Sequence, residues 1–301
     1  MVPGISSQIF YPHRLTPTRL DALAQSGACV IEIFAARFHF DYTNRQQMRE
    51  IATWFQSNDV RPALHSPITA DSYFSRHAGP NLNLVAMEKT RRIEAMEEIK
   101  RAFESAELIP FATAVLHLGL DGDTWSDYAL EYAITSIEHL KAFAGPLGLR
   151  LLLENLRNEV ATPNHLLDIL RLGHFDSTGI CLDVGHLHLA GLPLAPTFEA
   201  VRSRLAELHL HDNHGVAMHG VPYGGDAGKP DAHLWPASGT ERPSSLAKGS
   251  IAWQEVYALI ATLPTELPVI LEVSDTQADS PETATRLACE VFSHAARLSE
   301  L

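Results

Sequence analysis

The chain has 301 residues, of which 46% are hydrophobic and 20% charged, so it can bury a sizeable core and is too apolar for wholesale disorder. Its 36 acidic residues outnumber the 23 basic ones and give a net charge of −13. A field of that sign repels phosphate backbones, which disfavours nucleic-acid binding and favours cations and small neutral substrates.

Short apolar runs alternate with longer stretches of helical periodicity along the whole chain. The runs are mostly continuous rather than alternating, as in parallel strands that are covered on both faces. They predict eight strands, at 2–6, 28–34, 60–65, 112–118, 149–154, 179–183, 206–211 and 267–273.

The stretches between the predicted strands favour helices. Three of them begin with a capping residue before a first-turn proline: Thr16-Pro17, Thr162-Pro163 and Ser280-Pro281. The predicted helices lie near 17–26, 44–57, 84–107, 125–144, 163–171, 197–204, 252–262 and 280–299. Eight strand–helix units predict a single α/β domain over residues 1–301, a (β/α)8 TIM barrel with a parallel eight-stranded sheet. A doubly wound sheet is disfavoured because no GxGxxG or GxxxxGK[ST] motif occurs.

One long segment, residues 212–250, interrupts this alternation after the seventh predicted strand. It is rich in Gly, Pro, His and Asp. Loops of this length in compact domains are usually functional or disordered, and this one leaves the C-terminal face, where barrels carry their chemistry. We therefore expect a lid or a metal-binding loop, with a neutral insertion as the alternative.

Polar residues gather at the C-terminal ends of the predicted strands. Burying carboxylates and imidazoles together is costly unless they are paired or hold a metal. A mixture of nitrogen and oxygen donors suits zinc or manganese, whereas magnesium would use fewer histidines. The residues at these ends are Glu32, His65, His117, Glu154, Asp183, His209 and Glu272.

The individual residues differ in how strongly they indicate a site. Glu154 and Glu272 end aliphatic runs and each need a strong partner, which favours a functional role. Glu32 is open to three interpretations: a metal ligand, a solvated or Arg-paired residue, or a substrate contact. His65 and His117, taken singly, are also compatible with hydrogen-bonded core histidines.

Two further histidines accompany the predicted ligands. His186 follows Asp183 by three residues at a strand-to-loop turn, within reach of the same metal cluster. His211 shares a strand face with His209, but only the inner of the two is expected to reach the centre.

The three cysteines, Cys29, Cys181 and Cys289, are widely spaced in apolar runs, and their odd number gives no disulfide framework. We expect them to be buried and reduced. The N-terminal sequence MVPGISSQIF does not resemble a signal peptide, and no apolar run approaches the ~18–20 residues that a bilayer requires. The chain is therefore expected to be soluble and cytoplasmic.

The order of the motifs CLDVGHLHLAG, LHLHDN, DAHLW and ILEV resembles the xylose isomerase-like TIM-barrel superfamily over nearly the whole chain. That group includes sugar isomerases and epimerases, inosose-processing enzymes and nucleases of the endonuclease IV type. In its epimerases, one divalent ion is held by four strand-end residues, which correspond here to Glu154, Asp183, His209 and Glu272. The resemblance implies that Glu154 and Glu272 also transfer a proton on opposite faces of a metal-bound enediolate.

The endonuclease IV branch implies a larger set of ligands and up to three zinc ions. The matching positions are His65, His117, Glu154, Asp183, His186, His209, Asp231, His233 and Glu272. Three departures weaken this match: the net charge of −13, the sequence TADSYFSRHAGPNLNL after the HSP motif, and an insertion of roughly ten residues after DAHLW. The insertion leaves the ligand role of Asp231 and His233 open.

These patterns together predict a metal-dependent isomerase or epimerase of a small sugar, sugar acid or cyclitol. The alternative is a multi-zinc phosphodiesterase that resembles endonuclease IV. The expected cofactor is a divalent metal, zinc first, as one to three ions, with manganese or magnesium as alternatives. Glu32, His211 and Trp235 are the expected substrate contacts. We expect a carbohydrate substrate, no nucleic-acid or membrane partner, and a homo-oligomer, as in many members of the superfamily.

Overall fold

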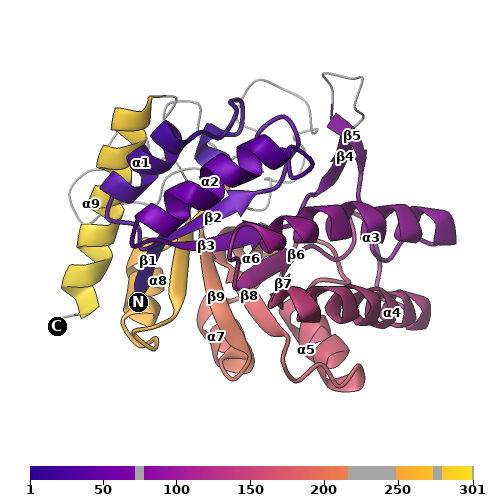
Figure 1. Cartoon of the computed structure of the whole chain (residues 1–301). Coiled ribbons are helices and arrows are strands. Elements are labelled where there is room, and N and C mark those ends of the chain that lie inside the picture. The colour runs from indigo at the N-terminus through magenta and orange to yellow at the C-terminus, as the bar shows by residue number, and fades with distance from the viewer. Residues whose placement is uncertain (72–77, 216–248, 274–279, 300–301) are drawn as a thin grey trace.

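Eight parallel strands close into a barrel in the computed structural model, which describes residues 1–71, 78–215, 249–273 and 280–299 (Figure 1). The hydrogen-bonded order is β1-β10-β9-β8-β7-β6-β3-β2, and β1 pairs with both β10 and β2 to complete the ring. The barrel strands are β1 (Val2–Ser6), β2 (Val30–Phe34), β3 (Arg61–His65), β6 (Thr113–Leu116), β7 (Arg150–Glu154), β8 (Gly179–Asp183), β9 (Leu205–Leu210) and β10 (Pro268–Leu271). The predicted (β/α)8 barrel is confirmed.

Helices surround the barrel and bury their apolar faces against it. They are α1 (Pro17–Gln25), α2 (Arg45–Ser57), α3 (Lys89–Phe103), α4 (Asp127–Ala144), α5 (Pro163–Leu172), α6 (Val184–Leu189), α7 (Leu194–Val201), α8 (Trp253–Ile260) and α9 (Pro281–Ser299). Short 3-10 turns lie at Ser7–Phe10, Glu104–Glu107 and Gly145–Leu147. Across the part of the chain that the structure describes, no helix is both long and apolar enough to cross a membrane.

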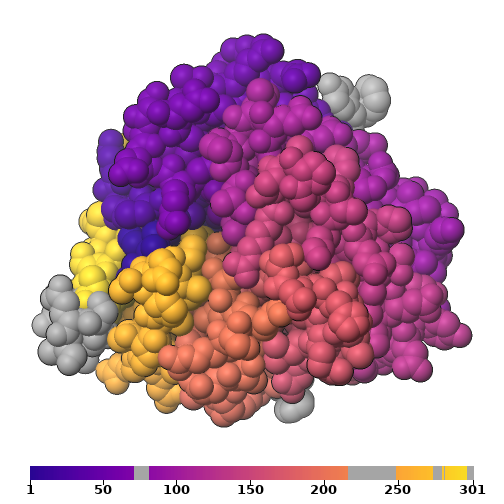
Figure 2. Space-filling view, turned by 60° about the horizontal axis from the view of Figure 1, so that its bottom comes forward, coloured from indigo at the N-terminus to yellow at the C-terminus, as the bar shows by residue number. Residues whose placement is uncertain are grey.

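The first and last helices, α1 and α9, lie side by side where the ring closes (Figure 1). In Figure 2 the colour runs round the molecule from indigo through magenta and orange to yellow, so the last helix lies beside the first part of the chain. The Thr285 hydroxyl on α9 donates to the Ala22 carbonyl oxygen on α1, which joins these helices across the seam.

The three helix starts predicted at prolines agree with the structure, although the Thr16 side chain makes no capping hydrogen bond. α1, α5 and α9 begin at Pro17, Pro163 and Pro281. The Thr162 hydroxyl accepts a hydrogen bond from the backbone N–H of His165, and the Ser280 hydroxyl accepts one from Thr283, so each satisfies an otherwise unpaired first-turn donor.

The hairpin strands β4 and β5 and the helix α6 were not predicted. An antiparallel hairpin, β4 (Thr69–Asp71) with β5 (Ala78–Asn81), lies outside the barrel, and α6 begins immediately after β8. The region predicted as one helix at 84–107 starts later, at α3, because residues 84–88 are turn and bend rather than helix. Several strands also end earlier than predicted, which leaves His117, His211 and Glu272 just beyond their strands rather than inside them.

A register slip between β8 and β9 decides which side chains enter the barrel. Ile180 pairs with Leu205, but Cys181 pairs with Glu207, so β9 carries an extra residue at this point. Because neighbouring side chains on a strand point to opposite faces, the slip sets Glu207 and His209 on the same side as Cys181 and Asp183. These side chains are fully buried.

The cysteines differ from one another in exposure. Cys181 is buried inside the barrel, as expected, and all three thiols are free. The expectation of burial is wrong for Cys29, which is exposed just before β2 begins, and Cys289 on α9 is half-buried. Membership of an apolar run therefore does not guarantee burial of a residue that precedes the strand itself.

Hydrogen bonds join the chain just before residue 216 to the chain just after residue 248. The Asp212 carboxylate accepts from the Trp253 indole N–H at 2.8 Å and from the Ile251 backbone N–H at 3.2 Å. The Ser250 backbone N–H donates to the Asn213 carbonyl oxygen at 2.8 Å. The expected lid, 212–250, lies outside the described residues except for these anchored ends.

Gln47 on α2 holds the loops that follow β1 and β2 on the C-terminal face. Its amide nitrogen donates to the Leu15 and His39 carbonyl oxygens at 3.0 and 3.1 Å, and its amide oxygen accepts from the Asp41 backbone N–H at 2.9 Å. We expect Gln47→Leu to lower the free energy of unfolding by about 2–4 kcal/mol, because it leaves buried backbone groups unpaired. Urea denaturation followed by circular dichroism measures this loss.

The adjacent Gln46 provides the matched control, because its side chain is exposed and donates to the Glu50 carboxylate one turn further along the same helix. Gln46→Leu should change the unfolding free energy by no more than about 0.5 kcal/mol. Equal losses in the two variants would contradict the role assigned to Gln47.

Candidate metal centre

Four strand-end residues bring their ligand atoms together at the C-terminal mouth of the barrel. Glu154 ends β7, Asp183 ends β8, His209 lies in β9, and Glu272 follows β10. One ligand atom from each lies within 4.8 Å of the others. His209 Nδ1 is 3.0 Å from Glu272 Oε2 and 3.3 Å from Glu154 Oε1. The barrel therefore converges these side chains on one small volume, as the sequence predicts.

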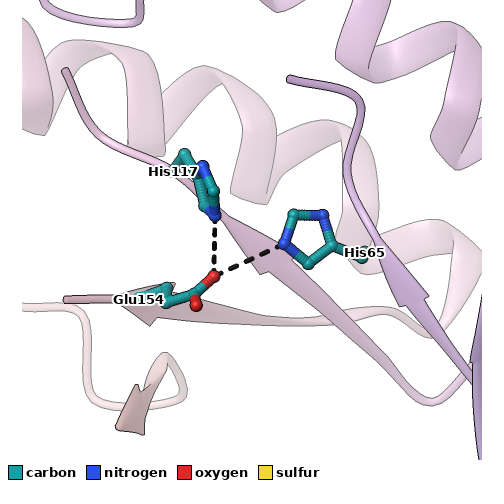
Figure 3. Close-up of side chains that lie close together, drawn as sticks. All are labelled: His65, His117 and Glu154. Carbon is teal, nitrogen blue, oxygen red and sulfur yellow. Dashed lines mark hydrogen bonds and ion pairs between the residues drawn. The ribbon is translucent and has the colours of Figure 1, made fainter. Parts of the chain in front are cut away.

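Glu154 also belongs to a second group of possible ligands. Its Oε2 lies 2.8 Å from His117 Nε2 and 3.4 Å from His65 Nε2, so both imidazoles point at one carboxylate oxygen (Figure 3). The other ring nitrogen of His65, Nδ1, lies 2.9 Å from the Ser66 carbonyl oxygen. Since a carbonyl only accepts, Nδ1 carries the proton in the neutral ring and Nε2 presents its lone pair to the centre.

Asp183 forms a third group with His186 and His211. Asp183 Oδ1 accepts from the His186 backbone N–H at 2.6 Å, which caps α6, and lies 3.1 Å from His211 Nε2. The Asn155 side chain exchanges two hydrogen bonds with the Asp183 backbone, at 2.7 and 3.0 Å. His186 Nδ1 lies 3.0 Å from the Asn155 carbonyl oxygen, which orients Nε2 away from that carbonyl.

Two more carboxylates lie on the far side of the His209 ring. His209 Nε2 is 3.2 Å from Glu32 Oε2 and 3.3 Å from Glu207 Oε1, and all three side chains are fully buried. Glu32, expected from the sequence to contact substrate, therefore lies against His209 and is absent from the lining of the cavity above the centre.

The charged groups of this cluster shift one another's pKa values. Burial would raise the pKa of Glu154, but the imidazoles of His117 and His209 hold that pKa well below its usual value. Burial would likewise raise the pKa of Asp183, but His211 and His186 lower it. Burial raises the pKa of Glu207 to about 7, and it raises the pKa of the Cys181 thiol well above its usual value. Cys181 is therefore a buried thiol rather than a thiolate.

A cavity of about 310 Å³ opens above the cluster. Its lining includes His117, His186 and Glu272 from the centre, polar groups such as Asn158, and apolar side chains such as Leu156. It also includes one ion pair, between Arg157 and Asp121 at 2.7 Å. Its volume lies at the small end of the range of ligand pockets, which suits a single small molecule.

The structure places most of the predicted site residues at this centre. His65, His117, Glu154, Asp183, His186, His209, His211 and Glu272 all lie in the groups described above. Asp231, His233 and Trp235 lie outside the described residues. The sequence patterns did not indicate Glu207 and Asn155, although Glu207 continues the alternation of His209 and His211 by one step.

The donor set fits a divalent ion. Asp183 Oδ2 is buried and has no hydrogen-bond partner among the described residues. A buried carboxylate oxygen without a partner is costly unless a cation or an ordered water satisfies it. Carboxylate oxygens and imidazole nitrogens within 4.8 Å of one another are the ligands that zinc and manganese accept.

Comparison with known proteins identifies the family to which the chain belongs. The family of xylose isomerase-like TIM barrels matches residues 20–294, and the chain belongs to this family. The uncharacterized protein MJ1311 of Methanocaldococcus jannaschii is 25% identical over 221 residues, which cover 70% of this chain and 71% of that protein.

Solved structures resemble the chain over its whole length. A D-tagatose 3-epimerase-like protein matches with a TM-score of 0.72 at 20% identity, covering 100% of this chain and 98% of that one. The IOLI protein with a binding zinc atom matches with a TM-score of 0.73 at 14% identity, with coverages of 100% and 98%. A D-psicose 3-epimerase with D-tagatose, from Clostridium cellulolyticum H10, gives 0.71 at 14% identity and covers 100% of both chains. At these identities the likeness establishes a shared fold.

His65 gives a pH-dependent prediction for the metal-free protein. Burial would lower its pKa, but the Glu154 hydrogen bond and the charges of Glu32 and Glu272 raise the pKa from 6.5 to about 9. Because the folded-state pKa is the higher one, the stabilisation is complete below pH 6.5 and is lost as the pH rises through 9. We expect the chelator-treated protein to lose up to ~3 kcal/mol of unfolding free energy over this interval through His65.

Urea denaturation at several pH values across this interval, for the wild type and His65→Gln, measures this contribution. The variant should show a weaker decline than the wild type. The exposed His139 on α4 gives the control, and His139→Gln should follow the wild-type pH profile. An unchanged profile in His65→Gln would refute the prediction.

Proposed function

We propose that this chain is a divalent-metal-dependent isomerase or epimerase acting on a small sugar, sugar acid or cyclitol. The observation that carries the proposal is the convergence of Glu154, Asp183, His209 and Glu272 within 4.8 Å. The cavity of about 310 Å³ directly above them, with Glu272 in its lining, gives a single sugar access to the cluster. Sugar epimerases among the structural neighbours add support, since they share the fold.

The four converging residues would hold the ion, with zinc or manganese as the best match to one imidazole and three carboxylates. When bound, a divalent ion polarises a carbonyl group and lowers the pKa of the adjacent C–H and hydroxyl groups. The low pKa of Glu154 and Asp183 keeps both carboxylates ionised and ready to act as ligands at neutral pH.

Glu154 and Glu272 are the proposed acid–base pair. They come from non-adjacent strands, β7 and β10, which are separated by β8 and β9, so their carboxylates approach the centre from different directions. One carboxylate would remove the proton from the carbon next to the substrate carbonyl. The other, in its protonated form, would return a proton to the opposite face, which inverts that carbon.

The cavity lining suits an uncharged polyol. Asp121 neutralises the Arg157 guanidinium through their 2.7 Å ion pair. Gln8 and Asn158 offer amide groups to hydroxyls, and Leu156 offers an apolar surface to a sugar face. This composition orients a small carbohydrate with a few polar contacts on a mainly apolar wall.

Loss of either glutamate should abolish proton transfer. We expect Glu154→Gln and Glu272→Gln to slow deuterium incorporation from D₂O into the carbon beside a ketose carbonyl by about 10²–10⁴-fold, because an amide neither accepts nor donates this proton. NMR spectra of a ketose panel incubated with manganese-loaded protein measure the rate. Glu266→Gln, at an exposed position before β10, should keep the wild-type rate. Absence of exchange across the whole panel for the wild type would refute the proposal.

A second candidate, a multi-zinc phosphodiesterase, rests on the group formed by His65, His117 and Glu154. Two ions that share the Glu154 carboxylate would suit the displacement of a phosphate ester. Elemental analysis that finds two or three zinc ions per chain, with cleavage of an abasic-site oligonucleotide, would favour this candidate. Given the net charge of −13, we expect no such cleavage.

A further inference from the structure

His209 stands between two sets of carboxylates. Its Nδ1 faces Glu272 and Glu154, at 3.0 and 3.3 Å. Its Nε2 faces Glu32 and Glu207, at 3.2 and 3.3 Å. The first pair lies at the mouth of the barrel, and the second pair lies on the opposite side of the ring.

Closure of the barrel brings the second pair of carboxylates, Glu32 and Glu207, together. Glu32 comes from β2 and Glu207 from β9, and β1 and β10 separate these strands in the sheet. In the strand register, Glu32 lies level with Ser6 and Ala63, and Glu207 lies level with Cys181. Both carboxylates therefore enter the barrel interior from separate strands and meet only at the His209 ring.

Burial of these two carboxylates is not explained by stability. Both side chains are fully buried, and neither oxygen of Glu32 nor Oε2 of Glu207 has a hydrogen-bond partner among the described residues. Glu207 Oε1 is hydrogen-bonded to His209 Nε2 at 3.3 Å, and Glu32 Oε2 meets the same nitrogen as an ion pair at 3.2 Å. In the strand register Ala63 lies level with Glu32 and Ile270 lies level with His209, and Ala63 and Ile270 belong to one small apolar cluster. Replacing such groups by apolar residues of similar volume is often neutral or stabilising, so their presence points to a role in the site.

The chemistry of imidazole defines that role. A neutral ring carries one N–H and one lone pair. A cation at the mouth of the barrel requires the lone pair at Nδ1, which places the proton on Nε2. That proton then lies within reach of two carboxylate oxygens, which fix the tautomer and the ring orientation and make Nδ1 a stronger ligand.

We infer that Glu32 and Glu207 are positioning residues that hold the His209 Nε2–H and thereby raise the affinity of the centre for its divalent ion. The inference rests on the proposed metal-dependent function. In this inference Glu32 contacts His209 on the side of the ring that faces away from Glu154 and Glu272, instead of contacting the substrate as the sequence predicts.

The test compares metal affinity with the stability of the metal-free protein. Methionine is similar in length to glutamate but is uncharged and only a weak hydrogen-bond acceptor, so Glu32→Met/Glu207→Met should weaken manganese binding by about 10–100-fold in calorimetric titrations. Above pH 9, where the contribution of protonated His65 is lost from wild type and variant alike, the unfolding free energy of the chelator-treated variant should stay equal or rise, because two buried charges are removed. A role in folding alone would lower that free energy and leave the affinity of the folded fraction unchanged.

Graded variants keep the test informative if the double methionine variant does not fold. Glu207→Gln and Glu32→Gln retain an acceptor oxygen, so each should lose less affinity than the matching methionine variant. Glu266→Gln should bind manganese as the wild type does. Wild-type affinity in all the Glu32 and Glu207 variants would overturn the inference while leaving the proposed function intact.

A spectroscopic measurement identifies the nitrogen that binds the ion. In protein labelled with ¹⁵N-histidine and loaded with ¹¹³Cd, coupling should appear at His209 Nδ1, with a proton on Nε2; the His209→Gln spectrum assigns the signals. Coupling at Nε2 would instead make Glu32, Glu207 and His209 a metal site of their own and overturn the positioning role. Failure of the wild type to bind any divalent ion would refute the metal dependence of the proposed function.

Discussion

Burial of several carboxylates and imidazoles inside one closed barrel is the constraint on which the rest of this structure depends. Each of these groups would be costly alone in a low-dielectric interior. The chain satisfies them by mutual contact. Glu154 is shared between His117, His65 and His209, and His209 is shared between four carboxylates. Removing any one shared residue alters the protonation of several neighbours, so the centre behaves as one electrostatic unit.

This unit depends on details of backbone geometry. The register slip between β8 and β9 turns Glu207 and His209 inward beside Asp183. The start of α6 directly after β8 gives Asp183 two tasks, since one carboxylate oxygen caps the helix while the other faces the cluster. The affinity of the centre and the start of this helix are therefore linked through a single side chain.

The barrel and the candidate ligands that end strands were predictable from the sequence, because an aliphatic strand rarely ends in a carboxylate such as Glu154 or Glu272 unless that group has a buried partner. The family resemblance is confirmed by a match over residues 20–294.

The position of Glu32 was harder to predict from the sequence. The face of the strand on which Glu32 lies follows from the alternation of side chains, but its contact with a residue of β9 arises only when the barrel closes. Glu207 was missed because a carboxylate preceded by Leu and Ala looks like a strand edge unless the bulge is known. The hairpin β4–β5 and the six-residue α6 were missed because segments this short carry too little periodicity.

The pairing of residues 212–215 with 249–253 has a consequence for the length of the segment between them. Asp212, Trp253, Asn213 and Ser250 close the ends of the intervening segment independently of what lies between them. Once such ends are fixed, doubling the length of a connecting chain adds only ~0.6 kcal/mol of closure entropy. The segment can therefore gain, lose or exchange residues at little cost to the barrel.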